Sequence, residues 1–355
     1  MFFSKKSIFF NFLKNNNLKE KLLNILKFFV FLSFTIFLFW FVYKDQNFDE
    51  VCKSLKNINY FWIFLALIFG ILSNLSRAAR WNLLIRALNY KPKFLNTFFA
   101  VMIMYLGNLA FPRLGEVSRV GILKKYEKIP FRNLLGTVII ERTIDFLMTF
   151  LVLLIVLLTQ FDVFIKFFKK NPEITKILEN FPSITVILFS FFVSIIFLIT
   201  VFSFFKKYFK ETPFYKKTSN FVKQILEGVK TIKNMDNKLL FIGHTFFIWF
   251  MYILMLYVTF FCFESMSDLS ILVGITVMLM GSFGMIAPVQ GGIGAWHFIT
   301  IETLLIYGIP GQDAKIFALI MHGSMTVMFI VIGFISLISL PIYNKKLKNN
   351  IKFKN

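Results

Sequence analysis

The chain has 355 residues, of which 57% are hydrophobic, and its mean hydropathy is +0.71. Soluble domains contain about 45–50% apolar residues and scatter them at short periods, so long apolar blocks argue against a soluble core. The 40 basic and 18 acidic residues give a net charge of +22, but the basic residues lie between apolar blocks rather than on one soluble face, which argues against nucleic acid as a partner.

Two other interpretations of the positive charge remain. Phe, Lys, Asn and Ile are all abundant, as in proteins encoded by AT-rich genes. This bias in composition explains part of the lysine count. In membrane proteins, Lys and Arg also collect on the cytoplasmic side and beside anionic lipids. We favour the membrane interpretation, with the bias in composition raising the lysine count further.

Apolar blocks recur along the whole chain, and a helix that crosses a bilayer needs about 20 such residues. The blocks lie at 26–43, 60–76, 97–111, 137–160, 183–205, 239–262, 269–287, 292–307 and 315–341. None alternates as a strand would, so helices are the remaining way to satisfy backbone groups in lipid. The sequence predicts an all-α polytopic membrane protein with about seven to nine transmembrane or re-entrant helices.

Basic segments between the blocks predict the orientation of the chain, because Lys and Arg collect on the cytoplasmic side. The basic segments are 1–27, 77–93, 206–238 and 342–355. The segments expected to face outward are 44–59, 161–182 and 263–268. Both termini are therefore expected in the cytoplasm.

The expected organisation is a single membrane domain with basic ends. It follows a basic leader over 1–27, spans 28–341 and ends in a basic tail over 342–355. Its halves would be 28–205 and 239–341, joined by the basic cytoplasmic loop 206–238. The first apolar block resembles a signal peptide, but Lys44, Asp45 and Gln46 follow it in place of a small-residue cleavage site, so we favour a retained anchor helix.

The block at 97–111 breaks the alternation, because basic segments lie on both sides of it. A re-entrant hairpin that turns near Gly107–Pro112 would return both segments to the cytoplasm. Non-helical backbone at that depth is tolerated only against protein or a wet cavity, so this hairpin is expected to line a cavity.

A second pair of short blocks, 269–287 and 292–307, meets at Pro288 and would form a hairpin that enters from outside. Paired broken helices of opposite orientation point to two inverted repeats around a central site. The alternative is that the two Pro-x-x-Gly turns resemble each other by chance. The sequence gives the two interpretations equal weight.

Arg77 and Arg80 end the second block and share one helix face, because residues three apart are neighbours. Two guanidinium groups there could hold one phosphate. The alternative is that they anchor the helix end beside an interfacial Trp81.

Arg113, Glu116 and Arg119 recur every three residues after the helix breakers Pro112 and Gly115. On a helix they would lie on nearly one face, where Glu116 could orient an arginine toward a lipid phosphate. The alternative is a salt-bridged surface turn, which contributes little free energy.

Glu141 and Asp145 lie one helical turn apart at the start of the fourth block. Ionisable groups at the edge of a membrane or inside it are costly and usually functional. These carboxylates could pair with the arginines of 113–119, or bind a coupling cation or proton. The alternative role is charge compensation.

The backbone around Pro288 is rich in glycine, with Gly291, Gly292 and Gly294 after it. A helix that begins after Gly294 would aim its free N–H groups at an anion. The alternative is that the glycines allow tight helix packing.

No metal or cofactor is expected from the sequence. His244, His297 and His322 have no metal-ligand spacing, and no nucleotide-binding or nucleophile motif is present. Cys52 and Cys262 also lack such spacing. A single bridge between these cysteines stays open, although two unpaired thiols are favoured.

In order and spacing, these motifs resemble the lysylphosphatidylglycerol synthase transmembrane-region family, also called flippase-like membrane proteins, over roughly residues 60–340. The matching residues are Arg77, Arg80, Trp81, Gly107, Asn108, Pro112, Arg113, Gly115, Glu116, Arg119, Glu141, Arg142, Asp145, Pro288, Gly291, Gly292, Gly294 and Ala295. The family pattern often has Glu two residues after the last of these glycines, where this chain has Trp296, so Glu302 is the nearest substitute for an acid role.

The resemblance implies a flippase-like transporter that moves an anionic or glycosylated lipid between leaflets of a bacterial inner membrane. Bifunctional members add a soluble domain that transfers lysine to phosphatidylglycerol, and the chain ends soon after its last block, so we expect the translocating half alone and no enzyme. Phosphate contacts would come from Arg77, Arg80, Arg113 and Arg119. Orienting or ion-coupling roles would fall to Asn108, Glu116, Glu141 and Asp145, and the breaks at Gly107, Pro112, Gly115, Pro288, Gly291, Gly292 and Gly294 would gate the cavity.

Two alternatives to transport remain open. One is an accessory or structural subunit of a cell-envelope lipid or glycan pathway. The other is a membrane enzyme that acts on a lipid-linked substrate, with Glu141 or Asp145 as its acid or base.

Overall fold

The computed structural model describes residues 26, 28–46, 48–111, 114–170, 193 and 235–352, and the regular structure of this part is entirely helical. The predicted block at 183–205, apart from Val193, and nearly all of the loop at 206–238 lie outside the described residues, as do Pro112 and Arg113. Within the described residues, four helices are long and apolar enough to cross a bilayer. They are Tyr60–Arg86, Phe131–Phe161, Lys238–Phe260 and Gly311–Leu347. The expected helical membrane protein is therefore confirmed.

The first half of the fold has a helical hairpin between two long helices. Helix α3 (Tyr60–Arg86) and helix α6 (Phe131–Lys170) flank α4 (Phe94–Ala110) and α5 (Leu114–Glu127). The open end of the hairpin is closed by Glu127, whose Oε1 accepts hydrogen bonds from Asn96 Nδ2 at 2.5 Å and from the Lys93 amide at 3.2 Å. The chain therefore enters and leaves this hairpin on the same side, as the charge pattern predicts.

The tip of this hairpin explains its small residues. Asn108 Oδ1 accepts a hydrogen bond of 2.8 Å from the amide of Gly115, which satisfies a free N–H in the first turn of α5. A Cβ atom on Gly115 would overlap the carbonyl oxygen of Met104, and one on Gly107 would lie 3.2 Å from the Cα of Gly115. Glycine at both positions lets the two backbones touch.

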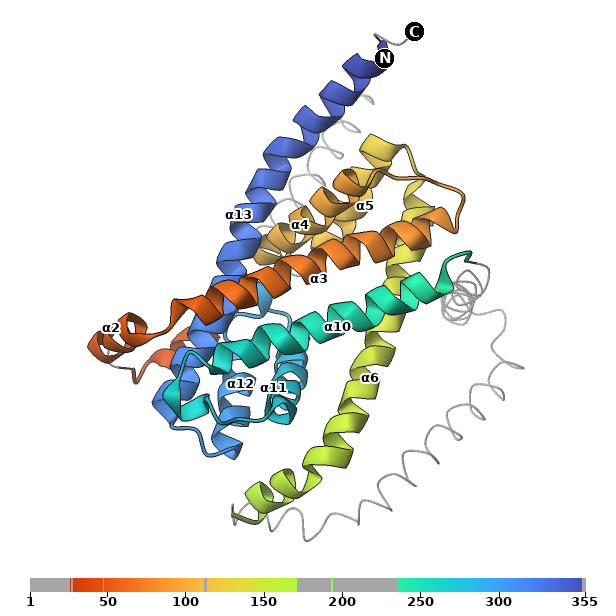
Figure 1. The fold of residues 1–355 in the computed structure, drawn as a ribbon. Helices are drawn as coiled ribbons and strands as arrows, with labels where there is room; N and C mark the ends of the chain where they lie inside the picture. Colours follow the sequence, from red (N-terminus) through yellow and green to blue (C-terminus); the bar gives the residue numbers. More distant parts are fainter. Residues whose placement is uncertain are drawn as a thin grey trace, which may run out of the picture.

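The second half repeats this arrangement (Figure 1). Helix α10 (Lys238–Phe260) and helix α13 (Gly311–Lys352) flank α11 (Ile271–Gly284) and α12 (Ala295–Ile306). Two 3₁₀ helices, η1 (Glu264–Met266) and η2 (Gln290–Gly292), lie in the connections. Helix α13 continues through Pro341 into the region expected as a basic tail.

The two halves run in opposite directions. Helix α10 is antiparallel to α3, since Ser76 contacts His244 near one end and the Cys262 thiol lies 3.7 Å from the Asn59 carbonyl at the other. Asn344, late in α13, bonds to Asn96 beside the open end of the first hairpin. The second hairpin opens on the opposite side. This is the inverted repeat that was one of two equally weighted predictions from the sequence.

The helix at Phe28–Tyr43 lies against the tips of both hairpins. Its Phe28 ring packs on Phe111, with centroids 4.9 Å apart, and Thr35 Oγ1 accepts a hydrogen bond of 3.2 Å from the Gln290 amide. Tyr43 donates a hydrogen bond to the Lys315 carbonyl at the start of α13. The first apolar block is thus built into the fold. A short helix, α2 (Phe48–Asn57), follows it.

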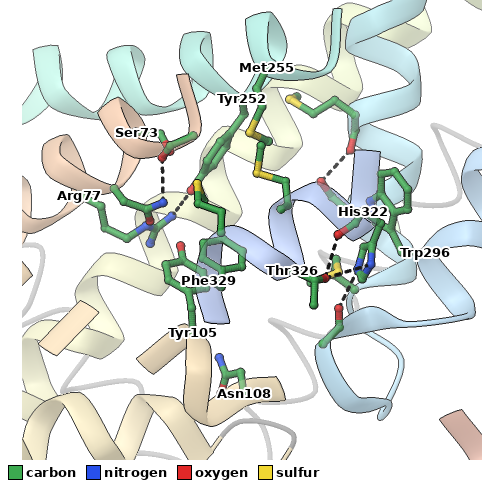
Figure 2. Close-up of a pocket in the computed structure, with 18 of the residues that line it drawn as sticks. Ser73, Arg77, Tyr105, Asn108, Tyr252, Met255, Trp296, His322, Thr326 and Phe329 are labelled. Atoms are coloured by element: carbon green, nitrogen blue, oxygen red, sulfur yellow. Dashed lines mark hydrogen bonds between the residues drawn. The ribbon is translucent and has the colours of Figure 1, made fainter. Parts of the chain in front are cut away.

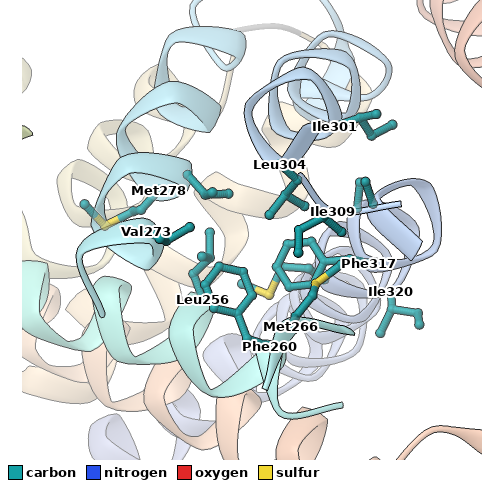
Figure 3. Close-up of a cluster of buried hydrophobic side chains, with 14 of the residues drawn as sticks. Leu256, Phe260, Met266, Val273, Met278, Ile301, Leu304, Ile309, Phe317 and Ile320 are labelled. Carbon is teal, nitrogen blue, oxygen red and sulfur yellow. The ribbon is translucent and has the colours of Figure 1, made fainter. Parts of the chain in front are cut away.

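Among the described residues, buried apolar side chains form two clusters, one mainly in the second half and one mainly in the first. The larger cluster holds the second hairpin between α10 and α13, with Phe260 packed on Phe317 and Leu304 nearby (Figure 3). The smaller cluster centres on Trp81 and Leu123. Large apolar side chains also cover the outer faces of the helices, as expected where lipid replaces water. Cys262 is a buried free thiol, in line with the favoured expectation for that residue.

Candidate functional site

The two hairpin tips meet inside the protein. The last residue of α4, Ala110, accepts a hydrogen bond of 3.1 Å from the side chain of Gln290 in η2. Leu109 lies beside Gly291, where a Cβ atom would come within 2.6 Å of its side chain. His322 on α13 bonds through Nε2 to the Gly291 carbonyl at 2.9 Å. Because an imidazole nitrogen facing a carbonyl must donate, Nε2 carries the proton.

A cluster of buried charges lies beside these tips and centres on Glu141 of α6. Its Oε1 accepts a hydrogen bond of 2.6 Å from Arg77, and its Oε2 accepts one of 2.9 Å from Arg119. One turn further along α6, Asp145 accepts hydrogen bonds from Arg80 at 2.7 Å and from Arg77 at 3.1 Å. The cluster therefore joins α3, α5 and α6.

Two further residues form the rim of the cluster. Glu116 lies 3.0 Å from Arg119 and 2.8 Å from Arg142, so it bridges a buried arginine and an exposed one. The side chain of Arg142 is 45% exposed, whereas those of Arg80 and Arg119 are fully buried. Arg142 is thus the member of the cluster that is most accessible from outside.

The cluster has one more positive charge than negative. Four arginines, Arg77, Arg80, Arg119 and Arg142, face three carboxylates, Glu116, Glu141 and Asp145, and four minus three leaves +1. Buried charges are costly unless they are paired, so a surplus charge at this depth favours binding of an anion. Several buried donors have no hydrogen-bond partner among the described residues, and they include the Nε of Arg77.

A cavity of about 480 Å³ opens between the two halves, next to the cluster (Figure 2). Its polar wall consists of Ser73, Asn74, Arg77, Tyr105, Asn108, Glu116, Arg142, Asp145 and Tyr252. Arg77 donates a hydrogen bond of 2.8 Å to the Tyr252 hydroxyl, and the Tyr105 ring stacks on Phe329 with centroids 4.2 Å apart. Trp296, His322 and Thr326 lie at another part of the wall. The volume falls within the range of about 300–1,000 Å³ that is typical of small-molecule sites.

Gly291, one of the predicted gating residues, lines the cavity, and the predicted binding and coupling residues fall into two groups. Arg77, Asn108, Glu116 and Asp145 line it. Arg80, Arg119 and Glu141 lie behind them, fully buried. The proposed phosphate-binding and coupling roles remain predictions, and Arg113 lies outside the described residues.

Some predicted residues have structural roles at this site. Trp81 is buried, lies under the Arg119 guanidinium at 4.5 Å and donates a hydrogen bond to Thr137, so its ring does not reach the surface of the protein. In the second hairpin, Gly291, Gly292 and Gly294 have φ angles of 59°, 78° and 84°, which glycine adopts readily. The amide of Gly294 donates to Nδ1 of His297, so the histidine caps the start of α12. Glu302 is exposed and does not line the cavity.

Several residues of the site were not singled out by sequence reasoning. Arg142 stands inside the matching motif between Glu141 and Asp145, so its position was available as a signal. Tyr105 and Tyr252 had no such signal, because they reach the cavity from helices distant in sequence. His297 and His322 also look unrelated in the sequence, yet their rings lie 4.7 Å apart. The described residues contain no group of three or more His, Cys, Asp or Glu side chains that could hold a metal ion.

Comparison with known proteins places the chain among membrane proteins. The model of the family described as the lysylphosphatidylglycerol synthase TM region matches residues 24–333. A UPF0104 membrane protein of Methanocaldococcus jannaschii is 35% identical over 101 residues. That alignment covers 27% of this chain and 30% of the relative, so less than a third of the relative is matched. No solved structure shows a significant match.

Proposed function

The chain belongs to the lysylphosphatidylglycerol synthase transmembrane-region family, and from this premise we propose that it moves an anionic lipid between the two leaflets of its membrane. The observation that carries the proposal is the surplus positive charge of the arginine–carboxylate cluster, which reaches the central cavity through Arg77 and Arg142.

A lipid phosphate fits this charge balance. A phosphodiester carries a single negative charge, and its addition would bring the net charge of the cluster to zero. Arginine suits the task because its planar group of donors matches the oxygens of a phosphate. Arg77 and Arg142 line the cavity, and the Arg142 side chain is 45% exposed, so both can contact a ligand there.

The carboxylates hold the arginines in place. Glu141 and Asp145 contact Arg77 and Arg80 from one face of α6, which fixes the guanidinium groups before a ligand arrives. Each carboxylate contacts at least two arginines, so its oxygens are occupied by fixed ion pairs. This arrangement argues against Glu141 or Asp145 as the acid or base of a membrane enzyme.

The inverted hairpins supply a route for the head group. Each hairpin begins on a different side, and their tips meet beside the cavity at Ala110 and Gln290. Movement of one tip would open the cavity toward one side while the other tip keeps it closed. Broken helices with this geometry surround the binding sites of many transporters.

A reconstitution experiment tests the proposal. The purified protein is placed in phosphatidylcholine vesicles with a trace of fluorescent phosphatidylglycerol, and dithionite is added outside. Empty vesicles should lose the fluorescence of the outer leaflet alone, and vesicles with the protein should lose nearly all of it. Bleaching that stops at the outer leaflet despite the protein would refute transport of this lipid.

The Arg142→Gln variant tests the site itself. Charge-assisted hydrogen bonds contribute about 1.5–3 kcal/mol, so the rate of lipid movement should fall by about 10- to 100-fold. The matched control is Arg86→Gln, which removes an exposed arginine at the end of α3 and should leave the rate unchanged. Equal rates in both variants would exclude Arg142 from the site.

A further inference from the structure

The apolar wall of the cavity has an unusual composition. The chain contains 51 phenylalanines and 14 methionines. The methionines that line the cavity are Met104, Met255, Met278, Met285, Met321, Met325 and Met328. Among the described residues, Phe329 is the one phenylalanine that lines it. Half of the methionines of the chain therefore gather at one cavity, although phenylalanine is far more abundant elsewhere.

Methionine gives such a wall distinct properties. Its side chain is unbranched, has three rotatable bonds and carries a polarisable sulfur, so it fits irregular apolar shapes. Phenylalanine is rigid and would fix one shape. A wall of thioethers offers a head group few hydrogen bonds, so a charged group placed against it would lose its hydration without replacement. The wall therefore suits a flexible apolar ligand.

The methionine wall lies next to the charged cluster along α3. A Cβ atom on Gly70 would come within 3.3 Å of the Met325 sulfur and 3.4 Å of the Met255 sulfur, so side chains from α13 and α10 meet at this glycine. Arg77 follows Gly70 by seven residues, which corresponds to about 10 Å along a helix. Figure 2 shows sulfur atoms between Tyr252 and His322. A ligand in the cavity would reach both the arginines and the sulfurs.

We propose that the first part of a lipid's hydrocarbon chain enters the cavity with the phosphate and packs against the methionine wall. This inference rests on the proposed function, which it deepens by naming the ligand class: an amphipathic molecule with one anionic phosphate and a flexible apolar chain. The arginines select the head group, and the adaptable sulfurs accept chains of different saturation and branching. The rest of the chain stays in the bilayer, since a cavity of about 480 Å³ is the size of a drug-like molecule.

Photo-crosslinking tests where the chain lies. The wild-type protein is reconstituted in phosphatidylcholine vesicles with phosphatidylglycerol that carries a diazirine in one acyl chain, close to the ester. After irradiation, mass spectrometry should find adducts on peptides that contain Met255 and Met325. Adducts confined to the exposed outer residues Phe250, Val331 and Ile335 would overturn the inference.

Transport measured in the same vesicles separates this inference from the proposed function. Adducts on the wall without movement of fluorescent phosphatidylglycerol would support chain binding and refute transport. Movement without such adducts would support transport and overturn chain binding.

A second measurement tests tolerance for different chains. Met255→Ile with Met325→Ile keeps the wall apolar but makes it stiff, because isoleucine is branched at Cβ. The ratio of rates for straight-chain and methyl-branched phosphatidylglycerol should change several-fold. The control is Met102→Ile with Met266→Ile, which alters two buried methionines away from the cavity and should leave the ratio unchanged. Equal ratios in both pairs would overturn the role of the wall.

Discussion

The side-chain amide of Gln290 donates a hydrogen bond of 3.1 Å to the backbone carbonyl of Ala110, which joins the tips of two hairpins that enter from opposite sides. Gln290 is buried, and its backbone N–H donates a hydrogen bond to Thr35 on the helix at Phe28–Tyr43, which lies against both tips. One glutamine thus connects three segments that are distant in sequence. Neither tip can move away from the other while this contact holds.

Gln290→Leu should loosen the junction of the tips. A hydrogen bond contributes about 0.5–1.5 kcal/mol net, so the population of separated tips should rise about 2- to 10-fold. The measurement is the rate at which a water-soluble maleimide labels Leu109→Cys in a chain that lacks Cys52 and Cys262. The rate should rise by the same factor.

Gln160→Leu is the matched control for this experiment. It removes a buried glutamine that bonds to Tyr307, away from the tips. Labelling of Leu109→Cys should not change in this variant. A rate in Gln290→Leu no higher than in the control would show that the contact does not hold the tips together.

Glu141→Gln should destabilise the protein strongly. The substitution leaves Arg77 and Arg119 without their common partner and raises the surplus charge of the cluster from +1 to +2. Loss of one member of a buried ion pair typically costs about 3–5 kcal/mol. A thermal unfolding scan in detergent should show a clearly lower midpoint, whereas Glu302→Gln, at an exposed glutamate, should match the wild type.

The double variant Glu141→Gln with Arg119→Gln tests whether the loss of stability comes from the broken ion pair. Removal of both partners restores the charge balance, so the double variant should be more stable than the sum of the two single losses predicts. Additive losses would show that Glu141 and Arg119 do not interact.

The sequence predicted the architecture better than the orientation of individual side chains. Loop charges were enough to predict the first hairpin, because a single crossing cannot leave the basic segments on both of its sides in the cytoplasm. The second hairpin was predicted from two short apolar blocks that meet at Pro288. Pairing with the arginines of 113–119 was one of the alternatives left open for the acids of α6, and Glu141 contacts Arg119. Which guanidinium groups face the cavity could not be predicted, since this depends on how each helix is rotated in the bundle.

The end of α3 illustrates a limit of hydropathy. The apolar block was placed at 60–76, yet the helix continues to Arg86. The residues after Ser76 include Arg77, Arg80 and Asn82, which lower the hydropathy of this part of the helix but are buried against protein, so the helix continues past the apolar block. Trp81 therefore lies in the bundle, stacked on Arg119. Met321, Met325 and Met328 recur at helical spacing on α13, but the sequence does not show that methionines of other helices meet them, so the methionine wall was not predicted.

Gly115→Ala should disrupt the first hairpin. The added methyl group would overlap the Met104 carbonyl, which belongs to the backbone of α4 and cannot rotate away. Overpacking typically costs about 1–3 kcal/mol, and a backbone clash should reach the upper part of that range. Gly121→Ala on the same helix meets no atom within 4 Å and should be neutral or stabilising by about 0.5–1 kcal/mol. Equal unfolding midpoints for the two variants would contradict close packing of α4 and α5.

Gly294→Ala and Gly308→Ala separate backbone strain from packing at the second hairpin. Both glycines have positive φ, 84° and 81°, so alanine should be strained at either site by about 1–2 kcal/mol. A Cβ atom on Gly294 would also lie 2.5 Å from the Leu38 side chain and 2.9 Å from the Phe39 amide, whereas one on Gly308 meets nothing within 4 Å.

Gly294→Ala should therefore push the helix at Phe28–Tyr43 away from the hairpin. Limited proteolysis should then cut between residues 44 and 46 several-fold faster in Gly294→Ala than in Gly308→Ala. Equal cleavage would mean that this helix does not depend on its contact with the tip, and the loss of stability would then reflect strain alone.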